Sequence, residues 1–348
     1  MKLLIVRLGA WGDMLIISPL IRFLHEQGHE IYLHTSEMGM NIMQHNPRIK
    51  KLLPYVSNSV PDHKLKAHWQ KLAEENGCEK IINLCESIER ALSFHPIDPM
   101  YSWPKEDRRL RGNKNFYEYT FEHAGYGKPH HDLVAYDHDF FIPEMHFTTK
   151  EEQEMASYFK QFRKPGEEKF VILWGLSGSG LNKSWPYVDF VIADVLRAHQ
   201  DVVFITLGDD LCQALETGED ARVIRKSGRW TVRQSSLACK YADLVVAPDT
   251  GLLHASGCFD TPKIGLIGSN TRENITKHFK NDFSVEANSD MVPCAPCFRL
   301  IYQASMQCPI EEQSYLPKCM ALGIDPKIVL ERIENAIERA AKGKNIAV

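Results

Sequence analysis

Hydrophobic residues near the start of the chain follow a pattern that predicts a βαβ unit. Residues 1–6 (MKLLIV) form a nearly unbroken apolar run, which is typical of a strand buried on both faces. A loop at 8–13 follows, and from residue 14 to 27 apolar side chains recur at helical spacing until Gly28 ends the predicted helix. Residues 30–34 (EIYLH) predict a second strand. A strand, a helix and a strand in this order predict a right-handed crossover and a parallel sheet.

The pattern is weaker between this unit and residue 168. A strand is predicted at 80–85 (KIINLC), and the polar stretch 101–114 is expected to be a loop. Helical patterns cover three further stretches, at 63–76, 116–124 and 150–162. The Pro165–Gly166 dipeptide and the charged residues around it indicate a break between two domains.

A second α/β series begins after this break. Its first predicted strand is FVILW, at 170–174, and a loop rich in glycine and serine follows it. Further strands are predicted at 201–207, 242–247 and 263–267, with helices at 186–199 and 326–341. The two series together indicate an α/β protein with two Rossmann-like, doubly wound domains.

Length and composition agree with two globular domains. The 348 residues are 44% hydrophobic and 25% charged, which excludes disordered, collagen-like and disulfide-stapled proteins. The formal net charge of −4 does not favour a general polyanion binder. The longest stretch without Asp, Glu, Lys or Arg has thirteen residues, 170–182, which is too short to cross a bilayer. Nine cysteines, an odd number, and an N-terminus interrupted by Arg7 and Asp13 predict a cytoplasmic protein.

The loop after the first predicted strand reads RLGAWGDML and runs from Arg7 to Leu15. Ligands of open parallel sheets bind beyond the carboxyl ends of the strands, so we expect this loop to face a cleft. Gly9 and Gly12 allow a sharp turn and a close approach to a ligand. Their spacing differs from the Gly-x-Gly-x-x-Gly of dinucleotide-binding enzymes, which argues against a nicotinamide cofactor. Asp13 has two interpretations, a functional carboxylate or a helix N-cap.

A second candidate loop follows the predicted strand at 242–247. There the backbone N–H groups of Thr250, Gly251 and Leu252 open a helix, which is an arrangement that binds anions such as a diphosphate. Asp249 precedes them, where it can accept hydrogen bonds from ribose hydroxyls. His254 lies one helical turn further on and is either a site residue or a core histidine.

A third candidate loop follows the strand at 170–174. Ser177 and Ser179 can donate to phosphate oxygens, and Lys183 can neutralise a leaving diphosphate. The spacing is not that of a Walker A loop. Three phosphate-compatible loops at strand ends favour a functional interpretation over three unrelated turns.

Taken together, these motifs resemble glycosyltransferase family nine, which contains the ADP-heptose:lipopolysaccharide heptosyltransferases. The matching residues occur in the order of the family's motifs and span nearly the whole chain. The first motif is met by Arg7, Gly9, Gly12, Asp13, Leu15 and Pro19, the second by Lys183, Trp185 and Pro186, and the third by Asp249, Thr250, Gly251, His254 and Ala255, with Pro262 and Gly268 after it.

The resemblance implies a GT-B fold in which two Rossmann-like domains face a cleft. The acceptor would bind mainly to residues 1–160 and the nucleotide-sugar to residues 161–325, and a helix at 326–348 would cross back onto the N-terminal domain. The resemblance also implies an inverting transfer that requires no metal and no cofactor, with a nucleotide-diphosphate sugar as donor. ADP-heptose is the expected donor and a lipopolysaccharide core sugar the expected acceptor.

The resemblance assigns roles to individual residues. Asp13 is expected to act as the general base and Lys183 to stabilise the departing diphosphate. The expected donor-binding residues are Ser177, Ser179, Lys183, Asp249, Thr250, Gly251, Leu252 and His254, and the expected acceptor-side loop comprises Arg7, Gly9, Trp11 and Gly12.

The sequence is compatible with other acceptors and other activities. The cations of 105–114 suit a phosphorylated saccharide, or another anionic acceptor such as hydroxylated bases of DNA, or are solvated loop residues. A nucleotide-sugar epimerase or hydrolase, or a non-catalytic nucleotide-sugar-binding protein, would have the same fold. The sequence predicts a monomer and leaves room for peripheral membrane contact.

Two patterns raise the question of a metal. Asp137 and Asp139 form an Asp-x-Asp pair, which is common by chance. Cys294, Cys297, Cys308 and Cys319 contain one C-x-x-C pair, so a structural zinc site is an alternative to free thiols. The spacing after Cys297 lacks the second close pair typical of such sites.

Overall fold

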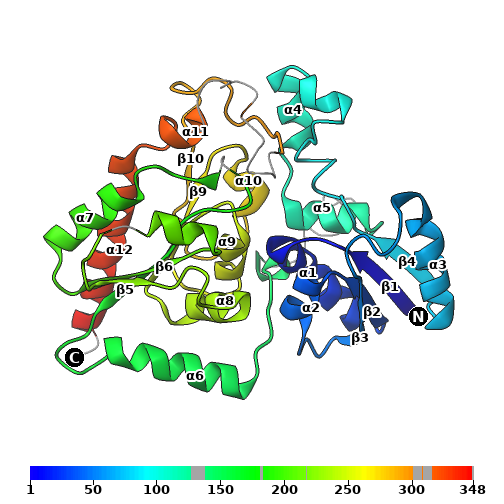
Figure 1. Cartoon of the computed structure of the whole chain (residues 1–348), viewed down its shortest axis with the longest axis horizontal. Coiled ribbons are helices and arrows are strands. Elements are labelled where there is room, and N and C mark those ends of the chain that lie inside the picture. Colours follow the sequence, from blue (N-terminus) through cyan, green and yellow to red (C-terminus); the bar gives the residue numbers. More distant parts are fainter. Residues whose placement is uncertain (127–137, 181–182, 217, 301–307, 309–315, 347–348) are drawn as a thin grey trace.

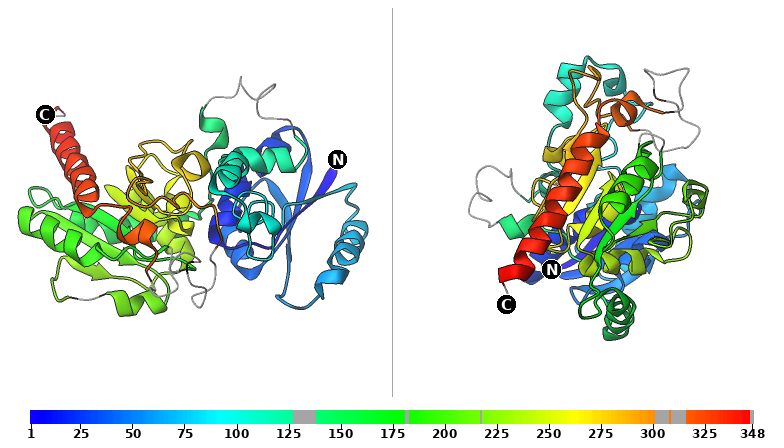
Figure 2. Two further views of the ribbon diagram at one scale, coloured as in Figure 1. Left: turned by 90° about the horizontal axis from the view of Figure 1, so that it is seen from above. Right: turned by 90° about the vertical axis from the view of Figure 1, so that its left-hand side faces the viewer.

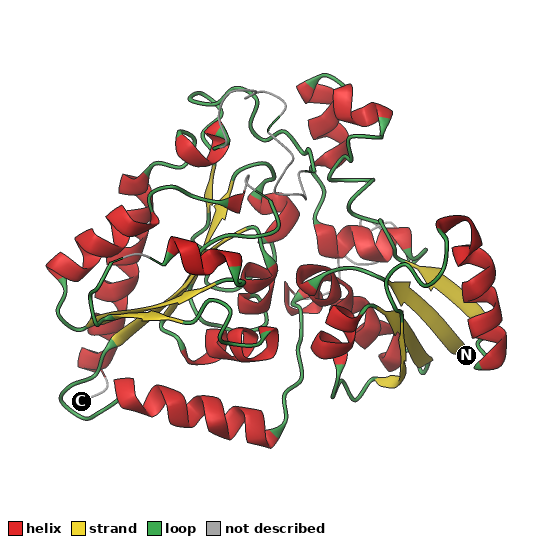
Figure 3. Cartoon of the chain, in the orientation of Figure 1, coloured by secondary structure: helices red, strands yellow, loops and turns green. Residues whose placement is uncertain are grey.

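The computed structural model describes the whole chain except residues 127–137, 181–182, 217, 301–307, 309–315 and 347–348. Two α/β halves lie side by side along the long axis of the molecule, with the N-terminus in one half and the C-terminus in the other (Figure 1). Each half contains a parallel sheet with helices on both faces (Figure 3). No helix among the described residues is both long and apolar enough to span a membrane.

The sheet of the N-terminal half has the strand order β3-β2-β1-β4, and all of its pairs are parallel. Side chains of β1 alternate between two buried layers, with Leu3 and Ile5 packed with α1 and Leu4 and Val6 packed toward α3. Burial on both faces explains why this strand is a continuous apolar run. The elements are β1 (Lys2–Arg7), α1 (Trp11–Glu26), β2 (Glu30–Thr35), α2 (Glu37–Met43), β3 (Ile49–Pro54), α3 (Leu65–Glu75), β4 (Lys80–Asn83), α4 (Lys105–Gly112) and α5 (Phe116–His123).

The sheet of the C-terminal half has the strand order β10-β9-β8-β5-β6-β7, again parallel throughout. Strand β5 is buried along its whole length. The helices are α6 (Thr149–Phe159), α7 (Val188–Ala198), α8 (Val232–Tyr241), α9 (Gly251–Ser256), α10 (Arg272–Ile275), α11 (Lys318–Ala321) and α12 (Pro326–Ile346). The strands are β5 (Phe170–Gly175), β6 (Val202–Leu207), β7 (Val223–Arg225), β8 (Leu244–Pro248), β9 (Lys263–Ile267) and β10 (Val285–Glu286).

Two local predictions from the sequence are wrong. Helix α1 begins at Trp11 rather than after Asp13, so Ala10 is the N-cap and Asp13 lies in the first turn. The stretch 101–114 is not a loop throughout, since it contains α4. Only one side chain of α4, Leu110, is apolar, so the sequence has no hydrophobic periodicity there.

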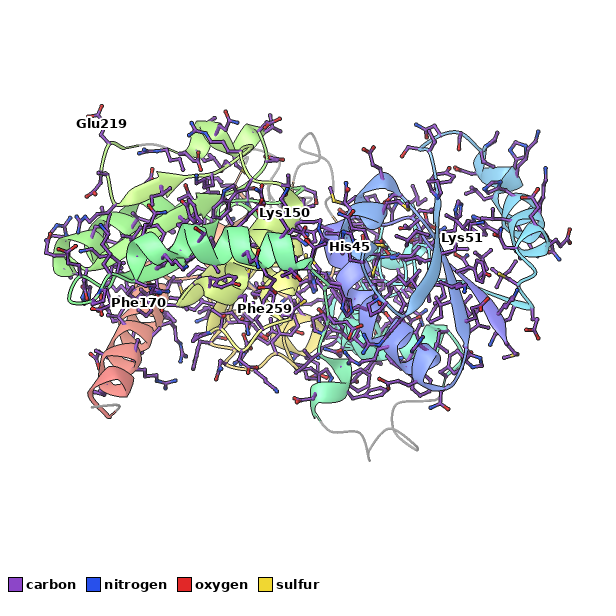
Figure 4. All side chains as sticks on the ribbon, turned by 90° about the horizontal axis from the view of Figure 1, so that it is seen from below. His45, Lys51, Lys150, Phe170, Glu219 and Phe259 are labelled. Carbon is purple, nitrogen blue, oxygen red and sulfur yellow. The ribbon has the colours of Figure 1, made fainter. Side chains whose placement is uncertain are left out.

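The predicted domain boundary at residue 160 and the predicted position of the last helix also need correction. Helix α6 packs against α8 and runs along the C-terminal half from Lys150, so the chain passes between the halves before α6 (Figure 4). Helix α12 packs against α7 and lies at the end of the molecule remote from the N-terminal half (Figure 2). It does not cross back, because its apolar side chains, among them Val329 and Ile333, complete the core of the C-terminal half.

The two halves contact each other in several places. Helix α1 packs against α9. Near α10, the Asn274 side-chain amide donates to the carbonyls of Gly112 and Lys114. Phe94 exchanges two backbone hydrogen bonds with the segment 298–300. These contacts bring the ends of both sheets to a common junction.

Candidate active site

The loops after β1 and β8 meet where the first turns of α1 and α9 touch. A Cβ atom on Gly251 would lie 2.5 Å from the Trp11 ring, and one on Gly12 would lie 2.9 Å from Cδ2 of His254. Both glycines are therefore required by the close approach of the two helices. The structure thus brings the acidic loop of the N-terminal half against the Thr-Gly turn of the C-terminal half.

Asp13 is held by its own loop. Its Oδ1 lies 2.7 Å from an Arg7 guanidinium nitrogen, and its Oδ2 accepts a hydrogen bond of 2.6 Å from the Ala10 N–H. A Cβ on Gly9 would lie 2.5 Å from Asp13 Oδ2, so Gly9 makes room for the carboxylate. The side chain of Asp13 is 22% exposed, which leaves part of the carboxylate accessible. Asp13 therefore accepts a hydrogen bond from the N–H of the N-cap residue Ala10 and keeps a partly exposed side chain at the junction.

Arg7 connects Asp13 to a second carboxylate, Glu89, which the sequence motifs did not identify. The guanidinium donates to both Glu89 oxygens, at 3.0 and 2.7 Å, and to the Leu84 carbonyl at 2.8 Å. Arg7 is only 1% exposed; burial opposes its charge, but Asp13 and Glu89 raise the pKa of Arg7 above its ordinary value. Burial, together with Asp13, raises the pKa of Glu89, and Arg7 opposes this rise. Two carboxylates thus share one buried cation.

On the other side of the junction, Asp249 is at the centre of a polar cluster. It accepts a hydrogen bond of 3.0 Å from the Asn270 side chain, and the Lys183 ammonium lies 3.9 Å away. Its other oxygen is 3.7 Å from Nε2 of His254. Burial disfavours the charged form of Asp249, yet Lys183, His254 and Asn270 hold its pKa well below the ordinary value. Asp249 is therefore an anion at neutral pH.

His254 is bound from the N-terminal half. Its Nδ1 lies 2.8 Å from the hydroxyl of Tyr117, which comes from α5. Tyr117 is completely buried, and burial, with Cys258 and Asp249, raises its pKa well above the ordinary value. No sequence motif marks Tyr117, because its role depends on a contact between residues 137 positions apart.

The loop after β5 contacts the same cluster. A Cβ on Gly178 would lie 2.7 Å from Thr250 and 2.8 Å from Lys183, so this glycine packs between them. Ser177 is hydrogen-bonded to Ser184 at 2.6 Å, and Ser179 is exposed. Of the predicted donor-binding residues, Leu252 has its side chain buried in the core, so only its backbone is available to a ligand.

Two buried polar atoms at the junction lack a partner among the described residues. They are the Thr250 hydroxyl and the indole nitrogen of Trp11. Buried polar groups in native proteins are normally hydrogen-bonded, and an exception calls for a specific explanation. Thr250 directly follows Asp249, and the Trp11 ring packs on Gly251, so both atoms lie where the two halves meet and fit a polar ligand there.

The other sequence candidates lie elsewhere. Within the described part of the chain no three His, Cys, Asp or Glu side chains are placed to hold a metal ion, so the zinc alternative for Cys294, Cys297, Cys308 and Cys319 gains no support. Asp137 is outside the described residues, and Asp139 forms an ion pair with Lys280 at 2.9 Å. Lys105 and Arg108 donate to backbone carbonyls of the C-terminal half, which makes them structural rather than free for an acceptor.

Comparisons with known proteins identify the family and the fold of the chain. The profile described as glycosyltransferase family 9 (heptosyltransferase) matches residues 66–306, more than half of the chain. No curated protein sequence matches.

Solved structures share the fold at low sequence identity. A family 9 glycosyl transferase from Veillonella parvula DSM 2008 is 13% identical with a TM-score of 0.64, and the match covers 97% of each chain. E. coli ADP-heptose lps heptosyltransferase II is 14% identical with a TM-score of 0.64 and coverages of 98% and 100%. E. coli heptosyltransferase WaaC with ADP is 16% identical with a TM-score of 0.56 and coverages of 97% and 100%. The expected fold class, two facing α/β domains of the GT-B type, is thereby confirmed.

Proposed function

The chain belongs to glycosyltransferase family 9, and on this premise we propose that it moves a heptose from ADP-heptose to a hydroxyl of an anionic saccharide such as the lipopolysaccharide core. Membership of the family makes the protein a nucleotide-sugar glycosyltransferase. The observation that carries the proposal is the direct contact of α1 with α9, which brings the Asp13 loop to the Lys183–Asp249–His254 cluster.

In the proposed complex the nucleotide-sugar binds to the C-terminal half. Lys183 offsets the charge of the diphosphate, and the Thr250 hydroxyl and the backbone N–H groups that open α9 donate to its oxygens. Asp249, held as an anion, accepts hydrogen bonds from ribose hydroxyls. The solved relative with ADP supports a nucleotide diphosphate as the ligand class.

Asp13 acts as the general base in this proposal. The acceptor oxygen attacks the anomeric carbon from the side opposite the diphosphate, the bond from this carbon to the diphosphate oxygen breaks, and Asp13 takes the hydroxyl proton. The anomeric configuration is inverted, and ADP leaves with the bonding electron pair. Arg7 fixes the Asp13 carboxylate in place, and the exposed part of the Asp13 side chain faces the acceptor.

A transfer assay tests the proposed function. The purified protein is incubated with ADP-heptose and the acyl-free, phosphorylated saccharide of a heptose-free lipopolysaccharide, and the product is analysed by mass spectrometry and NMR. We expect one added heptose with inverted anomeric configuration. Consumption of the donor at the same rate without an acceptor would instead indicate a hydrolase or epimerase, and transfer to hydroxylated DNA alone would exclude the saccharide acceptor.

A further inference from the structure

The indole N–H of Trp11 is a buried hydrogen-bond donor that has no acceptor among the described residues. An indole nitrogen donates and does not accept, so its partner must supply a lone pair. Native proteins keep few buried polar groups without a partner, because each one lowers stability. Trp11 as a whole is only partly buried, so it lies at the edge of the packed interior. A ligand that carries an acceptor oxygen would complete this group.

The surroundings of Trp11 differ from those of two other tryptophans whose buried indole nitrogen has no partner in the described part of the chain. Trp174 lies in the apolar core of the C-terminal half, and Trp69 packs against the apolar side chains between α3 and the first sheet. Trp11 lies instead where the two halves meet, and the Thr250 hydroxyl is a second buried group without a partner there. Two such groups at one junction indicate a shared polar ligand.

The five-membered ring of Trp11 lies against the loop that follows β8. A Cβ atom on Gly251 would be 2.5 Å from both Cγ and Cδ2 of Trp11, and these two atoms belong to the ring that bears the indole nitrogen. Gly251 follows Asp249 and Thr250, and the Lys183 ammonium lies 3.9 Å from Asp249. The indole N–H of the N-terminal half is therefore next to the residues proposed to bind the diphosphate.

Trp11 and Asp13 extend from different sides of the first turn of α1. Side chains two positions apart on an α-helix are separated by about 200° around its axis. Asp13 contacts Arg7 of its own half at 2.7 Å, whereas Trp11 contacts Gly251 of the other half. One loop therefore turns its carboxylate away from the donor half and its indole toward it. This direction places Trp11 on the donor side, although the resemblance to the family places it in an acceptor-side loop.

We infer that Trp11 is a donor-binding residue supplied by the N-terminal half, and that its indole N–H donates to an oxygen of the nucleotide diphosphate. The inference rests on the proposed function, because it adds a contact to that donor site. When the bond from the anomeric carbon to the diphosphate oxygen breaks, the electron pair passes to this oxygen and the negative charge of the diphosphate grows. The indole N–H stabilises that charge and keeps its own proton throughout.

Replacement of Trp11 by Phe tests the inference, because it removes the N–H and keeps an aromatic ring. The matched control is Trp69→Phe, which removes a buried indole N–H that also lacks a partner but lies on α3. ADP and adenosine are titrated against the full chain by calorimetry. We expect Trp11→Phe to weaken ADP binding about tenfold and adenosine binding little, and Trp69→Phe to change neither. The donor KM should rise in Trp11→Phe, while the acceptor KM stays the same.

Nuclear magnetic resonance of the wild type gives a second measurement that does not depend on how a variant packs. The chain has six tryptophans, and each contributes one indole N–H signal in the ¹⁵N-labelled protein. The signals absent from the spectra of Trp11→Phe and Trp69→Phe identify these two residues. We expect ADP to move the Trp11 signal downfield and to leave the Trp69 signal in place, and adenosine to move neither.

The outcomes separate this inference from the proposed function. If heptose is transferred to the saccharide but Trp11→Phe binds ADP as the wild type does and the Trp11 signal does not move, the inference fails and the function stands. If ADP binding depends on Trp11 as expected and no heptose is transferred, the inference stands and the function fails. Equal losses of adenosine and ADP affinity in Trp11→Phe, or a rise in the acceptor KM alone, overturn the contact with the diphosphate.

Discussion

The hydroxyl of Tyr117, on a helix of the N-terminal half, lies 2.8 Å from Nδ1 of His254 in the C-terminal half, and both side chains are buried. His254 in turn lies 3.7 Å from Asp249, which is 3.9 Å from Lys183. The proposed donor cluster is therefore complete only when the two halves are together. In the proposed complex Tyr117 is a positioning residue, because it would act on the donor through His254.

Replacement of Tyr117 by Phe removes this link and leaves Nδ1 of His254 buried without its partner. We expect the free energy of unfolding to fall by about 1–3 kcal/mol, which is the usual cost of an unsatisfied buried polar group. The KM for the donor should rise, while the KM for the acceptor should change little. Denaturant unfolding and steady-state kinetics measure these effects, with Tyr55→Phe as a control tyrosine outside the donor cluster. If Tyr117→Phe and Tyr55→Phe have the same unfolding free energy and the same donor KM, the hydrogen bond contributes to neither stability nor donor binding.

Replacement of Lys183 by Ala removes the cation closest to Asp249. Because Lys183 is proposed to bind the diphosphate, ADP and the ADP-sugar should lose more binding free energy than adenosine, by about 1.5–3 kcal/mol, the usual value for a hydrogen bond to a charged group. Calorimetric titration of all three ligands gives the comparison. Equal losses of binding free energy for adenosine and ADP would contradict the proposed binding of the diphosphate by Lys183.

Replacement of Glu89 by Gln weakens the double hydrogen bond that holds Arg7 against Asp13. We expect a lower kcat, by roughly tenfold, because Asp13 is then less firmly oriented, with the affinity for ADP unchanged. The pH dependence of kcat should also shift, since one of two interacting carboxylates is removed. The matched control is Glu86→Gln, an exposed carboxylate in the same turn that pairs with Arg90. If Glu89→Gln and Glu86→Gln have the same kcat and the same pH profile, Glu89 has no positioning role.

Lys263 should make stability depend on pH in the alkaline range. Its ammonium is fully buried and donates to the carbonyls of Phe259 and Lys280. Burial lowers the pKa of Lys263 from 10.5 to about 8, against the opposing effect of Asp282, Cys239, Cys258 and Asp260. Between these two pH values the unfolded chain holds a proton that the folded protein has lost, so stability rises with pH.

The comparison of wild type with Lys263→Met isolates this effect from other titrating groups. From pH 8 to 10.5 the wild type should gain about 3 kcal/mol in unfolding free energy relative to the variant. Urea unfolding at several pH values across this interval measures the difference. A difference that is constant or that shrinks as pH rises would refute the lowered pKa.

The sequence predicted the buried strands well and the exposed or short elements poorly. Strands β1, β5, β6, β8 and β9 are apolar runs, because helices cover both faces of their sheets. The edge strand β3 carries the exposed Lys50 and Lys51, and β7 has three partly buried residues, so neither has a clear hydrophobic pattern. Helix α4 depends on hydrogen bonds from Lys105 and Arg108 to a segment almost 190 residues away, which no local pattern reveals.

The residues of the candidate site also differ in whether the sequence could identify them. Asp13, Lys183, Asp249 and His254 lie in the loops or first helical turns that follow β1, β5 and β8, so their sequence context identified them as candidates. Glu89, Tyr117 and Asn270 join the site through contacts between distant segments, and their own sequence context carries no signal. Aromatic, carboxylate and amide side chains are common on turns and helices, so only the tertiary structure distinguishes these three.

Replacement of Asp13 by Asn tests the central claim most directly, because it removes the proposed base and keeps the size of the side chain. Transfer of heptose to the phosphorylated saccharide is measured with ADP affinity determined in parallel, and Asp62→Asn serves as an exposed control carboxylate. We predict that Asp13→Asn lowers kcat by roughly 10²–10⁴-fold, the usual contribution of a general base, and leaves ADP affinity within about twofold. Wild-type turnover in Asp13→Asn would contradict the account.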